Sequence, residues 1–209
     1  RAVRGARKAV DEGPWGRSTV EERAQALYRV AAVIERRFDE FLQAEVADTG
    51  RPVEQARKLD VYRGMANFRT FADLGKIAHG DFFETNLPDG TQLINYTKRK
   101  PLGVVASISP WNLPILSLTW KAAPALICGN AIVCKPSEET PSSAVLIAEA
   151  FHEAGVPPGV FNVVQGFGRD AGEPLVAHPD VRVISFTGST VTGNRIVKTA
   201  GLKKFSMEL

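Results

Sequence analysis

The sequence has few of the residues that build metal sites and disulfide frameworks. Its 209 residues include two cysteines, Cys128 and Cys134, and three histidines. The two cysteines lack the spacing of a metal site, and such sparse use of cysteine is typical of a reducing compartment. We therefore expect no disulfide framework, no metal site and a cytoplasmic location.

An excess of charge of one sign is also missing. The chain has 26 Lys and Arg against 23 Asp and Glu, a net charge of +3, and the basic residues are scattered. Binding to nucleic acid usually requires a basic block, so we expect no nucleic-acid partner, and RAVRGARK is interpreted as a solvated helix face. No signal peptide is visible, but the chain begins with Arg1, so we expect that a natural N-terminus precedes it.

One long stretch, Pro101–Trp120, has no charge, yet its prolines and polar residues argue against a membrane span. We predict instead a buried strand, GVVASIS, that ends in a tight Pro-Trp-Asn turn and leads into a helix. Asn112 then follows the carboxyl end of a strand. Ligands bind at that edge in open α/β sheets.

Helices are predicted before residue 80. In STVE, Ser18 is expected to cap a helix and Glu21 to reach back to it. The helix then carries apolar residues at helical spacing: Leu27, Val30, Ile34, Phe38 and Phe41. A second helical region follows Gly50-Arg51-Pro52 and runs to about Gly75. It is expected to direct five residues toward a core: Leu59, Tyr62, Met65, Ala66 and Phe68.

The pattern of apolar and polar residues changes between residues 81 and 100. There, β-branched and aromatic residues alternate with polar ones on both sides of a Pro-Asp-Gly turn, which predicts a β-hairpin.

Beyond Pro101, short apolar runs alternate with helical patterns. GVVASIS, AIVCK, VFNVV, VRVISF and KKFSMEL are typical of strands, and TWKAAPALICG, SSAVLIAEAFHEAG, AGEPLVAH and STVTGNRIVKTAG are typical of helices. Thr140-Pro141 is expected to start a helix, and Gly155 and Gly201 to end helices. Such alternation predicts a Rossmann-like α/β fold with a parallel sheet flanked by helices. We divide the chain into a helical part (1–80), a hairpin (81–100) and βα units (101–209).

Two segments at the carboxyl edge of the expected sheet, where Asn112 also lies, could bind a nucleotide. ISFTGSTVTG places Gly188 and Ser189 where a strand leads into a helix, a geometry that receives phosphate; an ordinary strand-to-helix turn is the alternative. The GxGxxG pattern is absent, and GFGRDAG, with Gly168 and Gly172, matches it only loosely.

The second segment is AIVCKPSEETP, in which Lys135 is followed by Ser137 and Glu138. A lysine there can bind ribose or phosphate oxygens, and a carboxylate can accept hydrogen bonds from ribose hydroxyls. The alternative is an exposed charged loop. This segment shares the expected edge of the sheet with PWN and FTGS, which favours the binding role.

These segments together resemble the NAD(P)-dependent aldehyde dehydrogenase superfamily. PWNLP, GNAIVCKPSEETP, GVFNVVQGFG, VRVISFTGST and MEL occur in the order and approximate spacing of that family, and GPWGRSTVEER and ADTGRP extend the resemblance over nearly the whole chain. SPWNLP, LTWKAAPALICGN and RGMANFR are most similar to the 2-hydroxymuconic and 2-aminomuconic semialdehyde dehydrogenases.

The resemblance implies NAD as the cofactor and oxidation of a small aldehyde to the carboxylic acid. Preference for NAD over NADP would come from Glu138, which would face the 2′-position of the ribose. The residues then implied for the cofactor are Ser109, Pro110, Trp111, Lys135, Ser137, Glu138, Gly168, Gly172, Phe186, Gly188 and Ser189.

Two further residues acquire catalytic roles from the resemblance. Asn112 would donate a hydrogen bond to the oxyanion that forms when a cysteine thiolate attacks the aldehyde, and Glu208 in MEL would act as the general base. The family's nucleophile lies downstream of this glutamate, and neither Cys128 nor Cys134 occupies its position. We therefore expect an inactive fragment that lacks the catalytic domain.

Arg63 is the candidate for binding the remote carboxylate of a muconic semialdehyde. Arg69 is its competitor, and a surface role or an ion pair with Asp60 is the alternative. Two other functions stay open: a catalytically silent nucleotide-binding module, and a dehydrogenase of betaine-type or aliphatic aldehydes. The full-length protein is expected to be a homodimer or homotetramer.

Overall fold

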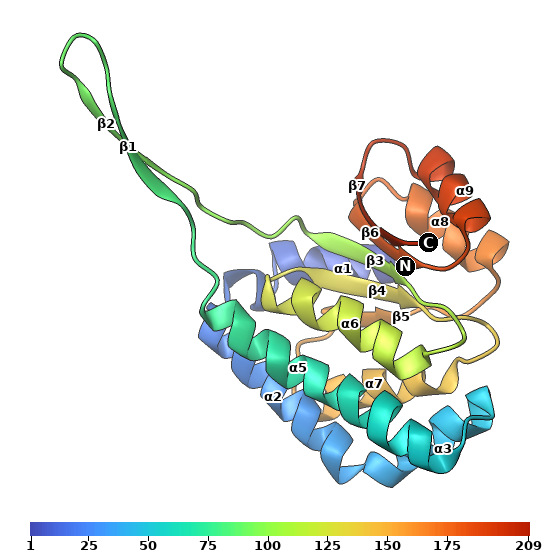
Figure 1. The fold of residues 1–209 in the computed structure, drawn as a ribbon. Helices are drawn as coiled ribbons and strands as arrows, with labels where there is room; N and C mark the ends of the chain where they lie inside the picture. Colours follow the sequence, from blue (N-terminus) through green and yellow to red (C-terminus); the bar gives the residue numbers. More distant parts are fainter.

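Five parallel strands form the central sheet of the computed structural model, which describes residues 1–209 (Figure 1). The strands lie in the order β5-β4-β3-β6-β7. Their bounds are β3 (Val104–Ile108), β4 (Ala131–Lys135), β5 (Phe161–Val163), β6 (Val181–Thr187) and β7 (Lys204–Glu208). The predicted Rossmann-like α/β fold is confirmed, and each strand-like run contains a strand.

Helices connect these strands on both faces of the sheet. One face carries α6 (Pro114–Ile127) and α7 (Ser142–Glu153), and the other carries α8 (Glu173–Ala177), preceded by the π-helical η3 (Gly168–Gly172), and α9 (Thr190–Ala200) (Figure 1). From β3 the chain first builds β4 and β5 on one side, then β6 and β7 on the other. The order therefore reverses between β3 and β6, and ligands of open α/β sheets bind at such a switch point.

The N-terminal helices pack mainly against α6 and α7. They are α1 (Ala2–Asp11), the 3-10 turn η1 (Trp15–Arg17), α2 (Val20–Arg36), α3 (Phe38–Thr49), α4 (Val53–Gln55), the π-helical η2 (Ala56–Val61) and α5 (Tyr62–Lys76). The larger apolar cluster joins α2, α3 and α5 to α6, α7 and one face of the sheet. Helix α1 packs on the opposite face, beside Val104 and Ala106. None of the helices combines the length and hydropathy that a bilayer span requires.

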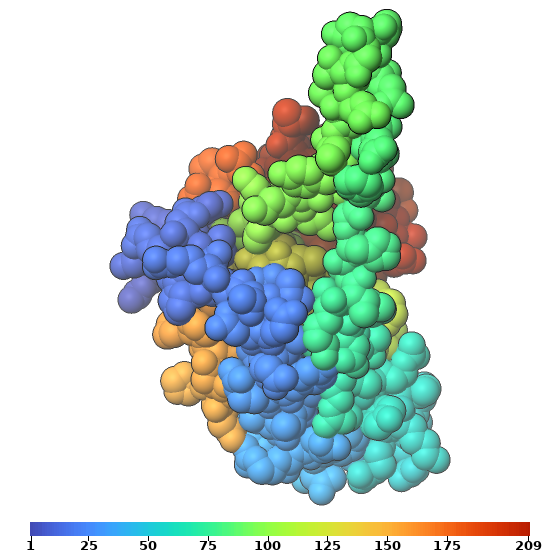
Figure 2. Space-filling model, turned by 90° about the vertical axis from the view of Figure 1, so that its left-hand side faces the viewer, coloured from blue at the N-terminus to red at the C-terminus, as the bar shows by residue number.

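The predicted hairpin is confirmed. Strands β1 (Phe82–Asn86) and β2 (Gln92–Tyr96) pair antiparallel around a turn in which Gly90 has a φ of 87°. The hairpin stands away from the rest of the molecule (Figures 1 and 2). Because no layer covers it, its large apolar side chains are exposed: Phe82, Phe83, Leu87, Leu93, Ile94 and Tyr96.

The cap expected at Ser18 lies one residue further on. Thr19 accepts from the amide of Glu22, whose carboxylate accepts from the amide of Thr19 at 2.8 Å. STVEE contains two overlapping capping boxes, and Ser18 is already used, because its hydroxyl donates to the carbonyl of Trp15 at 2.6 Å. The single helix expected through Phe41 is also wrong. It breaks at Arg37, whose guanidinium binds Glu40 and Glu149, so tertiary contacts override the local periodicity.

The expected burial of Leu59 and Tyr62 is wrong, whereas Met65 and Phe68 are buried as predicted. The cause is η2, because a π-helical turn holds more residues than an α-helical turn and shifts the phase of the helix beyond it. Leu59 and Tyr62 turn outward, and Asp60 is buried in their place.

Two helix starts also differ from the prediction. Helix α6 begins at Pro114, five residues before the expected TWKAAP segment, with proline in its first turn. Helix α7 begins at Ser142, so Pro141 is its N-cap residue and Thr140 does not cap it. Asp48 of α3 supplies the cap instead, since its carboxylate accepts from the amide of Ser142 at 2.8 Å. Gly155 and Gly201 follow helix ends as predicted, both with positive φ.

Candidate functional site

A cavity of about 470 Å³ lies at the carboxyl ends of β3, β4 and β6, beside the switch point. All the residues predicted to bind the cofactor line it, from Ser109 after β3 to Ser189 at the start of α9. Val176 of α8 and Ile196 of α9 contribute apolar walls. Segments far apart in the sequence thus meet at one edge of the sheet, as the strand pattern predicts.

Lys135 and Glu138 form an ion pair at this cavity. Lys135 is the last residue of β4 and is 4% exposed, and its Nζ donates to the carboxylate of Glu138 and to the carbonyl of Pro136, both at 2.9 Å. The hydrogen bond from Lys135 holds the pKa of Glu138 below its usual value. Glu138 is therefore anionic at neutral pH, and its partly exposed carboxylate can accept further hydrogen bonds.

Ser109 brings an unused hydroxyl to the same cavity. Its amide donates to the carbonyl of Lys135 at 3.3 Å, which ties the end of β3 to β4. Its Oγ is buried and has no hydrogen-bond partner within the chain. Because buried hydroxyls are almost always paired, this one fits a polar ligand or a water in the cavity.

The start of α9 has the geometry of an anion-binding helix N-terminus. Ser189 caps the helix by accepting from the amide of Thr192 at 3.2 Å, and the first-turn amides of a helix have no intrahelical acceptor. A Cβ at position 188 would lie 2.5 Å from the Phe186 ring, so glycine lets the loop close over that ring. The N-terminus of an 11-residue helix facing the cavity fits a phosphate group.

Asn112 lies just outside the cavity, one residue beyond Trp111, which lines it. Its side chain is exposed and makes no hydrogen bond within the chain. Its main-chain carbonyl accepts from Nη2 of Arg51 at 2.9 Å. The side-chain amide of Asn112 is thus free to donate to a ligand. Its main chain is fixed by Arg51, which follows α3.

Glu208 reaches the same edge from β7. It pairs in register with Thr187, and its carbonyl accepts from the amide of Gly188 at 3.1 Å. Lys121 of α6 donates to the hydroxyl of Thr187 at 2.6 Å. Burial lowers the pKa of Lys121, and the nearby charge of Glu208 opposes that shift. Lys121 was not among the predicted site residues; its signal in the sequence is a lone cation inside an apolar helix.

Arg63 is exposed on α5 and makes no ion pair or hydrogen bond within the chain. Its competitor Arg69 binds the carboxylate of Glu35 at 2.6 Å. Asp60 has its closest cation in Arg51, at 3.5 Å. Helix α5 runs beside the start of α6, since a Cβ at Gly64 would lie 2.9 Å from the Ile115 side chain.

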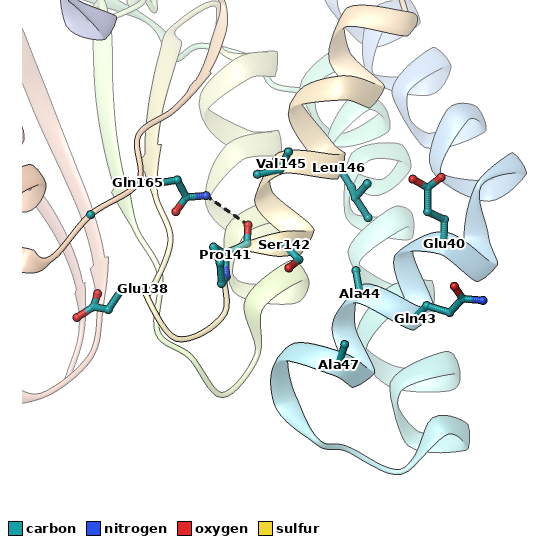
Figure 3. A pocket seen from close by; sticks show the side chains of 11 residues that line it. Glu40, Gln43, Ala44, Ala47, Glu138, Pro141, Ser142, Val145, Leu146 and Gln165 are labelled. Atoms are coloured by element: carbon teal, nitrogen blue, oxygen red, sulfur yellow. Dashed lines mark hydrogen bonds between the residues drawn. The ribbon is translucent and has the colours of Figure 1, made fainter.

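A second, larger hollow of about 790 Å³ lies between α3 and α7 (Figure 3). Its walls include Ala44 and Ala47 of α3 and Val145 and Leu146 of α7. Of the predicted site residues it contains only Glu138, at one margin, and Gln165 turns its amide to the carbonyl of Pro141 at 3.4 Å. The polar groups that could bind a ligand converge on the other cavity, at the carboxyl ends of β3, β4 and β6.

Comparison with known proteins gives a consistent result. Residues 1–209 match the aldehyde dehydrogenase family. Over 211 residues, the chain is 53% identical to a 2-aminomuconic 6-semialdehyde dehydrogenase from Pseudomonas sp. and 54% identical to a 2-hydroxymuconic semialdehyde dehydrogenase from Pseudomonas sp. strain CF600. A solved NAD+ complex of an aldehyde dehydrogenase from Bacillus cereus is similar in structure, with a TM-score of 0.91 and 40% identity.

All three comparisons cover 100% of this chain. They cover 43% of each Pseudomonas enzyme and 42% of the Bacillus cereus chain. The chain thus spans less than half the length of these relatives.

Proposed function

Because the chain belongs to the aldehyde dehydrogenase family, we propose that it is the cofactor-binding part of a longer enzyme that oxidises an aldehyde to a carboxylic acid with NAD. One observation carries this proposal. The cavity at the switch point gathers an unpaired serine hydroxyl, a lysine–carboxylate pair and a helix N-terminus. In this proposal residues 1–80 and 101–209 form the cofactor-binding part, and 81–100 form its hairpin arm.

The residues present fit a dinucleotide. Lys135 and Glu138 would bind the hydroxyls of the adenosine ribose, and the start of α9, with Gly188 and Ser189, would bind the pyrophosphate. Ser109 would give its unpaired hydroxyl a partner. When bound, NAD supplies the acceptor for the hydride that leaves the substrate.

Asn112 would act on the substrate itself. Its side-chain amide would donate to the oxygen of the aldehyde as negative charge develops there, and Glu208, at the end of β7, would accept a proton as general base. Neither cysteine of the chain suits the nucleophile. Burial raises the pKa of Cys134 to about 12. Cys128 follows the far end of the 14-residue α6, about 20 Å from Asn112. We propose that the thiol comes from another part of the protein.

We propose a semialdehyde with a remote carboxylate, of the muconic type, as substrate. The support is Arg63, an exposed arginine without an internal partner on the helix beside Asn112, together with the activities for which the similar Pseudomonas enzymes are named. Arginine can hold a carboxylate with two hydrogen bonds. A betaine-type or aliphatic aldehyde is the competing substrate class.

The test is steady-state formation of NADH by the full-length protein, with a muconic semialdehyde and an uncharged aldehyde of similar size. We expect turnover with NAD and a preference for the carboxylated substrate. No turnover with any aldehyde would favour the silent nucleotide-binding module. Residues 1–209 alone should be inactive, and turnover of that fragment that depends on Cys128 or Cys134 would contradict the proposal.

We also propose that the full-length protein is a homodimer or homotetramer. The support is the projecting hairpin, whose apolar side chains are exposed, since soluble proteins usually cover such patches with a partner. Light scattering on the full-length protein tests this, and a monomer would contradict it.

A further inference from the structure

The turn that carries Asn112 is held in place by residues from α3 and the segment after it. Arg51 donates to the carbonyl of Asn112 at 2.9 Å. Three residues later, the amide of Ile115 donates to the carboxylate of Glu45 at 3.4 Å. Helix α6 has no side-chain cap of its own. The position of the turn therefore depends on these contacts from outside it.

Arg51 has a second contact, with a carboxylate that is out of place in a protein core. Asp60 is 0% exposed, and neither of its carboxylate oxygens has a hydrogen-bond partner. Its closest cation is Nη1 of Arg51, at 3.5 Å from Oδ2. A buried carboxylate is costly unless a cation compensates it, so Asp60 draws the guanidinium of Arg51 inward.

The two contacts use two different nitrogens of one guanidinium. Nη1 faces Asp60 and Nη2 donates to Asn112. A planar guanidinium fixes the angle between its nitrogens, so its orientation toward Asp60 also fixes its orientation toward the turn. A lysine would present a single nitrogen, without the fixed geometry by which the two nitrogens of a guanidinium orient each other's contacts.

Asp60 lies in the π-helical η2, a form of helix that is rare and frequently marks functional sites. The π-helical turn buries Asp60 and leaves the predicted core residues Leu59 and Tyr62 exposed. The buried carboxylate, which is costly, therefore lies in the segment where the helix is distorted, and the distortion is what places Asp60 in the interior.

We propose that Arg51 is a positioning residue, which links the carbonyl of Asn112 to the buried Asp60 and so aims the side-chain amide of Asn112 at the substrate. Asp60 anchors Arg51. The inference rests on the proposed role of Asn112 and adds the residues that hold it. A donor displaced by about 1 Å can cost ~10²-fold in rate, so Arg51→Ala should lower kcat by roughly 10- to 100-fold and change KM little.

The kinetic test is a double-mutant cycle in the full-length protein. Arg51→Ala is measured in the natural background and in the Asn112→Ala background. We expect a loss of kcat in the first and little further loss in the second, with partial recovery in Arg51→Lys. Arg57→Ala is the matched control, because Arg57 is half-buried like Arg51 and its ion pairs with Asp39 and Glu54 do not reach the turn. Equal losses in both backgrounds would overturn the proposal.

Removal of Arg51 takes away the closest cation to the buried Asp60, which could unfold the region for an unrelated reason. The double variant Arg51→Ala/Asp60→Asn removes that charge. It should match Arg51→Ala in kcat and exceed it in thermal stability. Full recovery of kcat in the double variant would show that the unpaired charge, and not the lost contact with Asn112, caused the defect.

A second readout does not depend on catalysis. The full-length protein is labelled with 5-fluorotryptophan, and the ¹⁹F resonance of Trp111, next to Asn112, is assigned by its loss in Trp111→Phe. We expect this resonance to shift or broaden in Arg51→Ala and to stay in place in Arg57→Ala. An unchanged resonance in Arg51→Ala overturns the proposal whatever the kinetics. If Asn112→Ala alone keeps full kcat, the proposed role of Asn112 fails, and the resonance alone decides whether Arg51 holds the turn.

Discussion

The carboxyl edge of the sheet and the junction of α3, η2 and α6 use charged groups in opposite ways. At the edge, Lys135 pairs with a partly exposed Glu138 whose pKa is lowered. At the junction, Glu45 and Asp60 are both 0% exposed, and burial raises the pKa of each. The edge keeps its carboxylate ionised and open to a ligand, whereas the junction buries its carboxyl groups against the main chain and Arg51.

This difference distinguishes residues that would contact a ligand from residues that fix the position of those contacting residues. Glu45 accepts from the hydroxyl of Ser143 and from the amide of Ile115, so it bridges the first turns of α7 and α6. Its neighbour Asp48 caps α7 from the same helix. From this contrast we expect that variants at the carboxyl edge of the sheet change activity, and that variants at the junction of α3, η2 and α6 first change stability or geometry.

The largest effect is expected at Asn112. In the full-length protein, Asn112→Ala should lower kcat by ~10²–10³-fold, the usual cost of losing one donor to an oxyanion, with a smaller change in KM. Steady-state kinetics measure both. Asn86→Ala, at an exposed position of the hairpin, is the control and should leave kcat unchanged. A rise in KM with unchanged kcat would make Asn112 a residue of substrate binding only.

Glu45 should give the next effect, on stability. Burial raises its pKa from 4.5 to about 7, so the folded state binds the proton more tightly than the unfolded state. The stabilisation is complete below pH 4.5 and is lost as the pH rises through about 7, at most about 3 kcal/mol of unfolding free energy. Urea unfolding between pH 4.5 and 8 should show this slope in the natural protein and not in Glu45→Gln.

The control for Glu45 is Asp39→Asn, an exposed carboxyl on the same helix, with a side chain 79% exposed. It should keep the slope. If Glu45→Gln keeps the slope as well, Glu45 is already ionised in the folded protein, and the contrast between junction and edge is lost.

Arg63 should affect one class of substrate. Arg63→Ala in the full-length protein should lose ~1.5–3 kcal/mol in kcat/KM toward carboxylated semialdehydes, the value of a hydrogen bond to a charged group. Uncharged aldehydes of similar size should be nearly unaffected. Arg69→Ala is the matched comparison, because the side chain of Arg69 is bound to Glu35. Equal losses on both classes of substrate would make Arg63 a structural residue.

The smallest effect is expected at Glu138. A carboxylate near the 2′-phosphate of NADP costs about 1 kcal/mol in well-solvated surroundings, so Glu138→Gln should shift selectivity toward NADP by roughly fivefold. Titration with both nucleotides measures the ratio of their dissociation constants. Glu139→Gln, at the neighbouring exposed residue, should leave it unchanged. Tighter binding of NADP than NAD by the natural protein would contradict the assignment of Glu138.

The sequence predicted the parts of the molecule whose signals are local. Each strand is a short apolar run between turns, and the carboxyl ends of parallel strands must meet, so the strand pattern grouped the PWN, Lys135–Glu138 and FTGS segments. The family resemblance supplied the rest of the cavity, including Gly168 and Gly172. Arg51, Asp60 and Glu45 could not be found this way. The contacts of Arg51 with Asn112 and of Glu45 with Ile115 join residues far apart in the chain. The π-helical η2, which buries Asp60, contradicts the periodicity on which the prediction rested.

The position of β3 in the sheet bears on how the chain folds. This strand pairs with β4 on one side and with β6 on the other. Its pairing with β6 can form only after the ribosome has synthesised residues 181–187. Helices α2 and α5 bury their apolar faces against α6 and α7, which are also synthesised later. During translation the N-terminal third must therefore leave the ribosome with apolar surface uncovered. We expect slow folding, governed by pairings of high contact order, and a need for chaperones that hold the early helices until α6 and α7 have been synthesised.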